Sequence, residues 1–376
     1  MTTALQPPIT LALEPLDVLF FRDGRPFAPG AVLTSGRPVP QTLAGALRTW
    51  ILEAKGCDFK ALGEAVRKGQ SFGEALAAQS SALGALADMA IRGPWFTCNG
   101  QPVVPVPATL RRIERDNDHP ERIVRLNPFK DPMPGWRSEL GEKPLWWRGK
   151  GRLNPLGDAF LTMAGLAQFL NGKDPQPETV LRDLLAYDRR VGIQIASATQ
   201  TVVDGALFSA GFLALKPGVG LAAEIRLPKE TGLEIPAATV LPLGGAGRRV
   251  AVTRREPLAW PRPQKHTAPA KHRLLLLTTP ALFEANEAQN AWKPPGLQPK
   301  AAAVPRPEPV SGWDLALRGP KPLRFAVPAG AVYFLDSPAG AHDAMTTDSW
   351  VSGSLCTGET AAAGWGAFIE GVWDYA

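Results

Sequence analysis

The sequence predicts an α+β protein of two domains, and three observations point to this class. A chain of 376 residues exceeds what a single hydrophobic core usually serves. Its first half mixes extended segments with amphipathic helical ones, whereas its second half consists mostly of short extended segments. An apolar share of 45% is ordinary for folded proteins, and 37 glycine with 38 proline residues indicate many turns and loops.

The first predicted element is a strand over residues 9–21, where larger apolar residues alternate with smaller or polar ones before a second apolar run. Apolar residues then recur with helical spacing from Gln41 until Gly56, which ends this helix. Arg48 lies near the exposed side of the helix. A second helical stretch, roughly residues 58–90, follows it.

A β-hairpin is predicted next, because Asn99-Gly100 separates two extended segments and both central residues of the favoured turn need positive φ. A further helix follows, with Asn154 as its N-cap and Gly172 after its last turn. Extended structure resumes near Arg189. This order of strand, helix, hairpin, helix and strand is that of a ferredoxin-like domain.

The predicted elements suggest two consecutive domains. An N-terminal ferredoxin-like domain would span residues 1–188, with an insertion at about 106–153 that contains many arginine and tryptophan residues and almost no periodicity. A second α+β domain would span residues 189–376, where short strands alternate with proline-rich loops.

The charge distribution favours an anionic partner. The formal net charge is +6 and the pI is about 9.3. The excess is uneven, because residues 247–273 alone contain eight lysine and arginine residues against one glutamate.

Three widely spaced cysteines, Cys57, Cys98 and Cys356, indicate neither a disulfide framework nor a metal site, and they fit a reducing cytoplasm. No secretory signal is expected, because no basic residue precedes Arg22 and no long apolar run is present. The longest apolar run, residues 274–277, is too short to span a bilayer.

Catalysis finds little support in the sequence. None of the four histidines lies in the first hundred residues, and no HExxH, GxSxG or GxxxxGK[ST] motif is present. His119 and His266 lie in polar or proline-rich loops, which favours ordinary solvated histidines. A single general base in a loop stays compatible with this pattern, but no catalytic residue, metal or cofactor is expected.

The first strand ends in Arg22, Asp23, Gly24 and Arg25, which place two guanidinium groups around a tight turn. Such a turn suits an anionic ligand. Equally, Asp23-Gly24 can form a simple turn in which Asp23 pairs with a neighbouring arginine in solvent.

The glycine cluster in residues 242–250 has a similar double interpretation. Glycines there let the backbone approach a ligand closely, with Arg248 and Arg249 next in line to meet a phosphate. The alternative is a plain turn with solvated arginines. Near the C-terminus, Gly364 and Gly366 flank Trp365, which would either stack on a base or belong to the core.

Six motifs follow one another along the chain: "LEPLDVLFFRDGRPF", "SGRPVPQTLAGALR", "DRRVGIQI" with "GALFSAG", "LPLGGAGRRV", "GWDLALRGPKPLRFAVPAGAVYFL" and "GWGAFIEGVW". In this order they resemble the family of the third Cmr subunit of type III-B CRISPR effector complexes, which belongs to the RAMP superfamily of RNA-binding proteins. The resemblance runs from about residue 9 to residue 374 and mainly omits residues 57–150 and the proline-rich loops. The glycine loop departs from the family pattern at Ala246, where an acidic residue is usual.

The resemblance implies two ferredoxin-like domains in tandem with large loop insertions, and a non-catalytic role in antiviral defence in the cytoplasm. Such a subunit holds the repeat-derived 5′ handle of the crRNA and docks the large polymerase-like subunit, while a backbone subunit cuts target RNA. By this resemblance Arg22 and Arg25 would clamp handle phosphates or the neighbouring subunit, and Gly24 would allow close approach.

Residues at strand ends, glycine turns and the start of the first helix make up the predicted RNA-binding set, because cations track phosphates and helix N-termini attract anions. The set is Arg22, Asp23, Gly24, Arg25, Ser35, Gln41, Thr42, Arg48, Arg189, Arg190, Gly244, Gly245, Gly247, Arg248, Arg249, Gly364, Trp365 and Gly366. Two alternatives stay open. One is a crRNA-processing endoribonuclease that uses a histidine, and the other is a purely structural subunit whose arginines meet protein acids.

Overall fold

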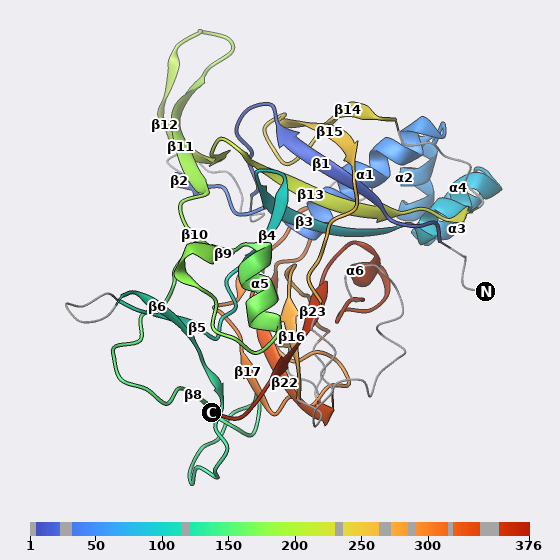
Figure 1. The fold of residues 1–376 in the computed structure, drawn as a ribbon. Helices are drawn as coiled ribbons and strands as arrows, with labels where there is room; N and C mark the ends of the chain where they lie inside the picture. Colours follow the sequence, from blue (N-terminus) through green and yellow to red (C-terminus); the bar gives the residue numbers. More distant parts are fainter. Residues whose placement is uncertain are drawn as a thin grey trace. The chain divides into compact units, whose positions relative to one another are not determined.

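The computed structural model describes residues 5–22, 32–114, 120–229, 236–262, 272–284, 291–314, 319–338 and 353–376 (Figure 1). Many short strands and few helices make up this part of the chain, which confirms the expected mixture of α and β structure. Within these ranges no helix is long and apolar enough to cross a membrane.

The chain forms two compact units, each assembled from three segments. Unit 1 comprises Met1–Pro94, Leu184–Glu256 and Pro309–Arg324, and unit 2 comprises Trp95–Asp183, Pro257–Glu308 and Phe325–Ala376. The units therefore interleave, whereas the sequence suggested the consecutive segments 1–188 and 189–376. Strand pairing is the reason, since β1 (Ile9–Pro15) pairs antiparallel with β13 (Val219–Arg226) and β15 (Arg249–Arg255), which both come from the later half.

The sheet of unit 1 has the strand order β3-β13-β1-β15-β14, where β3 is Ala90–Cys98 and β14 is Ala238–Pro242. Leu11 and Leu13 of β1 are buried, as the predicted alternation requires. The predicted first strand is shorter than expected, because the chain leaves this sheet after Pro15. Leu19 then forms an isolated bridge with Leu213 instead.

The helices of unit 1 follow the predicted order. They are α1 (Pro40–Ala54), α2 (Phe59–Arg67), α3 (Phe72–Ala77), α4 (Ser81–Ala85) and the 3-10 turn η1 (Leu86–Asp88). In α1 the buried residues include Leu43, Leu47 and Ile51, which confirms the helical spacing. The stretch predicted as helical over residues 58–90 is several short helices. Its polar residues explain the breaks, because Asp58, Ser71 and Ser80 each accept bonds from the first turn that follows.

A separate three-stranded sheet in unit 1 has the order β11-β12-β2. Its members are β11 (Leu185–Ile195), β12 (Val202–Leu215) and the short β2 (Val32–Thr34), which runs parallel to β12. β11 contains the extended segment predicted from Arg189. In Figure 1 the two long strands project from the rest of unit 1 as a hairpin.

Unit 2 contains a four-stranded sheet in the order β17-β22-β16-β23, with every neighbouring pair antiparallel. The strands are β16 (His272–Leu277), β17 (Ala301–Ala303), β22 (Val332–Pro338) and β23 (Phe368–Trp373), and the short helix α6 (Gly358–Ala362) precedes β23. Helix α5 (Met163–Leu170) contributes Phe169 to a core that includes Trp95, Phe334 and Trp373.

The helix predicted to begin after Asn154 begins after Thr162 instead, whose hydroxyl accepts from the Gly165 N–H. The residues before it are extended because β9 (Phe160–Leu161) pairs with β4 (Gln101–Pro105) and β10 (Val180–Leu181). The 3-10 turn η2 (Pro177–Thr179) precedes β10.

The hairpin predicted at Asn99-Gly100 is confirmed. β3 continues from unit 1 into unit 2, where Cys98 pairs with Gln101 of β4, and Asn99 and Gly100 have φ of 49° and 75°. The insertion that follows forms two small antiparallel ladders, β5 (Leu110–Ile113) with β6 (Arg122–Arg125) and β7 (Asn127–Pro128) with β8 (Leu145–Trp146). Short strands also form near residue 310: β18 (Glu308–Val310) with β21 (Arg324–Ala326), and β19 (Trp313–Asp314) with β20 (Gly319–Pro320).

Candidate nucleic-acid interface

The glycine turn of unit 1 packs against the segment that follows β1. The Gly245 N–H donates to the Phe20 carbonyl at 2.7 Å, and a Cβ on Gly244 would lie 2.6 Å from that same oxygen. Gly244 has φ of +83°. Close approach at these two glycines is therefore to the chain's own backbone. Only Gly247, with φ of +67° and open space around its Cα, leaves room for a ligand.

Ser35 joins two backbone segments, the one that ends at Phe21 and the one that begins at Ser35, which together we call the stem. The Phe21 N–H donates to Ser35 Oγ at 2.9 Å, and that hydroxyl donates to the Gly36 carbonyl at 2.9 Å. Ser35 is 2% exposed. The buried hydroxyl is therefore engaged by the backbone at Phe21 and Gly36, and its role as a phosphate donor stays a prediction.

The predicted residues Asp23, Gly24 and Arg25 lie outside the described residues. Arg22 is exposed and is the last described residue before them. The described residues that the first motif contributes to this region include Asp17, Phe20 and Phe21.

Arg190 and Arg248, from distant motifs, converge on one phenylalanine. Their guanidinium carbons lie 5.0 Å and 4.6 Å from the centre of the Phe212 ring, which in turn lies 4.8 Å from the Phe20 ring. Asp17 joins the two arginines: its Oδ2 lies 2.6 Å from Arg248 and 3.5 Å from Arg190.

These two arginines are balanced by acids. Asp188 lies 2.7 Å from Arg190, so two carboxylates face two guanidinium groups. The Val18 N–H, followed by the two arginines, holds the pKa of Asp17 below its usual value. For this pair the structure matches the alternative in which arginines meet protein acids.

Two of the other predicted cations, Arg189 and Arg249, have no carboxylate partner among the described residues. Arg189 and Arg249 are exposed, and so is Arg254 on the same strand as Arg249. Among the described residues, no carboxylate forms an ion pair with any of these three. Each of these three can therefore meet a phosphate without first losing an acid.

At the start of α1, the Gln41 side chain donates to the Ser311 carbonyl at 2.5 Å. The predicted donor to phosphate is thus engaged by a neighbouring segment of unit 1. Thr42 and Arg48 are half-buried on the same helix, and the helix has no side-chain cap at Val39.

The C-terminal glycines belong to the core of unit 2. Trp365 is 2% exposed, and its carbonyl accepts from Ser354 Oγ at 2.6 Å. A Cβ on Gly366 would lie 2.7 Å from Cys356 Sγ, and Gly364 has φ of +95°. The structure therefore matches the alternative in which Trp365 belongs to the core, because the ring is covered by protein and the two glycines serve a tight turn.

Two basic residues of unit 2 are also turned inward. Arg125 donates to the carbonyls of Phe169 and Val372 at 2.8 Å and 2.9 Å, and burial lowers its pKa to about 10. Arg273 is buried in an ion pair with Glu370. The formal charge of the chain therefore exceeds the charge that its surface presents.

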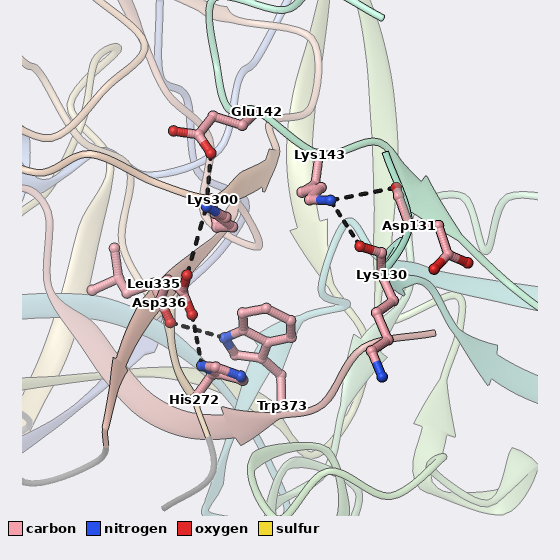
Figure 2. A network of polar contacts seen from close by, with 9 residues as sticks. All are labelled: Lys130, Asp131, Glu142, Lys143, His272, Lys300, Leu335, Asp336 and Trp373. Carbon is pink, nitrogen blue, oxygen red and sulfur yellow. Dashed lines mark hydrogen bonds and ion pairs between the residues drawn. The ribbon is translucent and has the colours of Figure 1, made fainter. Parts of the chain in front are cut away.

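His272 is the histidine that the described residues contain, and it lies in a polar network (Figure 2). Its Nδ1 lies 3.0 Å from Asp336, and its ring stacks on Trp373 at 4.6 Å. Asp336 also lies 3.6 Å from Lys300, which pairs with Glu142 at 2.7 Å. The hydrogen bond to Glu142 raises the pKa of Lys300.

This network attaches the inserted segment to the sheet of unit 2. The backbone N–H of Lys143 donates to the Lys300 carbonyl at 2.9 Å, and its ammonium donates to the carbonyls of Lys130 and Asp131 (Figure 2). Two carboxylates surround one lysine, so the cluster does not suit a phosphate. The part of the chain that the structure describes contains no group of three or more His, Cys, Asp or Glu residues that could hold a metal.

The projecting hairpin carries an apolar face that was not expected from the sequence. Six large apolar residues on β11 and β12 are exposed, and Val191 at 69% is the most exposed of them. The six are Tyr187, Val191, Ile193, Ile195, Val202 and Leu207. Tyr187, Val191 and Ile193 lie at alternate positions of β11, and Ile193 pairs with Leu207, so these four share one face. The register shifts after Ile193, and Ile195 then pairs with Val202. The alternation of these apolar residues was visible in the sequence, but their lack of a covering layer was not.

Comparisons with known proteins place these features in context. A family model described as CRISPR-associated protein (Cas_Cmr3) matches residues 11–373. Two similar solved structures are the type III-B Cmr-beta bound to cognate target RNA, and the same assembly bound to cognate target RNA and AMPPnP in state 1. Each shows 17% sequence identity and a TM-score of 0.49, with 86% of this chain and 86% of that chain covered. No curated protein matches the chain.

Proposed function

Because the chain belongs to the Cas_Cmr3 family of CRISPR-associated proteins, we propose that it is a crRNA-binding subunit of a type III-B effector complex. In this proposal unit 1 holds the repeat-derived 5′ handle of the crRNA, and the subunit contributes to antiviral defence in the cytoplasm without catalysing a reaction. The observation that carries it is that four motifs meet at one end of β1. The first and second motifs are joined at Phe21 and Ser35, and the glycine turn and the strand that contains Arg190 contact the first motif.

The chemistry of this region suits a single RNA strand. Single strands are held by cations that follow the phosphates, together with backbone groups at close approach. Arg249 and Arg189 supply unpaired cations, and Gly247 supplies open backbone. Arg190 and Arg248 have a different role in this proposal: with Asp17 they hold the site in shape.

We assign the apolar face of the β11–β12 hairpin to contact with other components of the complex, which include the large polymerase-like subunit and backbone subunits. Large contiguous apolar patches are uncommon on monomers and mark interaction surfaces. A charged substitution such as Ile193→Glu should therefore prevent assembly of the complex without unfolding the isolated chain.

We also propose that each unit is a ferredoxin-like domain. In that fold the third strand lies between the first two, and the fourth lies beside the first. The orders β3-β13-β1-β15 and β17-β22-β16-β23 both fit this scheme. Each unit departs from it in its helices, because the first crossover of unit 1 is helical whereas in unit 2 the helix α6 lies in the second crossover.

The binding proposal is tested by crosslinking assembled complex to crRNA labelled in its 5′ handle. Adducts on unit 1 are expected, and their complete absence from this chain would favour the purely structural alternative. Salt dependence sharpens the test: Arg249→Ala should lower the slope of log affinity against log salt by about 0.7, the value for one phosphate of a single strand. The matched control, Arg248→Ala, should change this slope less, because Asp17 already balances that arginine.

The endoribonuclease alternative is tested by incubating the isolated chain with repeat RNA. No specific scission is expected. Scission that is lost in His119→Ala or in His272→Ala would contradict the non-catalytic role, and it would identify which of the two histidines acts.

A further inference from the structure

A short ribbon, described over residues 309–314 and 319–324, is fixed next to the start of α1 in unit 1. Gln41 donates to the Ser311 carbonyl, and Ser311 Oγ donates to the Lys321 carbonyl at 2.8 Å. The Lys321 N–H closes the ribbon by donating to the Gly312 carbonyl at 2.8 Å. The two arms of the ribbon are thus bonded to each other and to the helix, so side chains on it have a defined position.

Trp313 is the most unusual side chain of this ribbon. It pairs across the ladder with Pro320, and it is 60% exposed. The two other strongly exposed tryptophans of the described chain, Trp136 and Trp146, are 44% and 45% exposed. A tryptophan that keeps most of its surface in water while its backbone is held in a ladder presents a flat face to a ligand.

Two cations lie on the same ribbon as this ring. Lys321 and Arg324 are both exposed, and no carboxylate of the described residues forms an ion pair with either. The Lys321 side chain runs over Gly312, because a Cβ built there would lie 3.9 Å from Lys321 Cδ. An exposed aromatic face beside unneutralised cations is the arrangement by which proteins hold single-stranded nucleic acid.

We propose that Trp313 stacks on an unpaired base of the crRNA, and that Lys321 and Arg324 meet the adjoining phosphates. This inference rests on the proposed crRNA-binding function and adds a residue that contacts the face of a base rather than a phosphate. An RNA ligand is favoured over an apolar protein segment by the charges, because the ribbon's cations would need acidic partners at a protein interface.

The test uses assembled complex with crRNA that carries 5-iodouridine at each uridine of the handle in turn, followed by irradiation and mapping of adducts. We expect an adduct at Trp313. Loss of one base–aromatic stack corresponds to a factor of roughly 5 to 150, so Trp313→Ala should lower adducts on the ribbon at least about 5-fold. Trp313→Phe should retain most of them, and the control Trp136→Ala should leave them unchanged.

The outcomes separate the two proposals. Adducts on this chain that never include the ribbon would overturn the inference and leave the proposed function standing. No adducts anywhere on this chain would overturn both. If Trp313→Ala instead prevents assembly while Trp313→Leu restores it, the ring serves an apolar protein contact, and the RNA assignment is wrong.

Discussion

The three glycines of the turn after β14 make distinct predictions for stability, because their surroundings differ. In Gly244→Ala the new Cβ meets the Phe20 carbonyl at 2.6 Å in a backbone with φ of +83°. The left-handed conformation costs an L-residue about 1–2 kcal/mol. Moving the carbonyl also disturbs its bond from the Gly245 N–H, worth about 0.5–1.5 kcal/mol. The expected total loss of unfolding free energy is about 2–3 kcal/mol.

The neighbouring glycines serve as matched controls. Gly247→Ala has the same conformational cost but open space, so it should lose only about 1–2 kcal/mol. Gly245→Ala has an ordinary φ and ordinary contacts at 3.4 Å and 3.5 Å with Phe20, so its effect should be near zero. Thermal unfolding measures all three, with about 2–4 °C per kcal/mol for a unit of this size. If Gly244→Ala instead unfolds at the same temperature as Gly247→Ala, the close approach to Phe20 costs nothing and the predicted difference between the two glycines is wrong.

Three further changes test the assignments above. Ser35→Ala should cost about 1–3 kcal/mol in thermal unfolding, since it leaves the buried Phe21 N–H unpaired; an unchanged melting temperature would contradict the stem role. Arg125→Met should cost about 2–5 kcal/mol because two buried carbonyls lose their donor, whereas the exposed Arg122→Ala should not; equal effects of the two would be inconsistent with that account. The lowered pKa of Asp17 means that its stabilising contribution is complete above about pH 4, the ordinary range of an aspartate, and is lost as the pH falls through the lowered value. The melting temperatures of the wild type and of Asp17→Asn should therefore converge only in strong acid, and a difference that persists there would disprove the linkage.

Local signals in the sequence predicted those elements whose cause is local. The spacing of Leu43, Leu47 and Ile51 is enough to make α1 amphipathic, and Asn99-Gly100 is enough to set the hairpin turn. Both were correct because no distant partner is needed to choose between alternatives.

Elements that depend on distant pairing were not predicted. Asn154 and Thr162 are both good N-caps. The helix begins after Thr162 because Phe160 and Leu161 are extended and pair with β4 and β10. The interleaving of the two units has the same cause. Nothing local to β1 indicates that its partners lie after residue 215.

The candidate site divides in the same way. The motifs correctly predicted which segments lie close together, because Phe20, Gly245 and Arg248 do meet in the structure. Their roles within it were not readable from sequence, since a glycine that approaches a ligand and a glycine that approaches a carbonyl have the same letter. Trp365 is the clearest case: a Gly-Trp-Gly turn is the same pattern whether the ring faces RNA or the core.

Formal charge misleads for a related reason. The stretch from Gly247 to Arg273 contains eight basic residues, but Arg248 faces Asp17 and Arg273 is buried with Glu370. An arginine in such a pair adds little to the field that an RNA meets, because the acid cancels it at short range and solvent screens the rest. Affinity for RNA should therefore follow the few unpaired cations, Arg249 among them, rather than the charge of the stretch. The acids are therefore as informative as the arginines. Each acid identifies an arginine that holds the site together, and exposed arginines without such an acid are the ones that we propose for the phosphates.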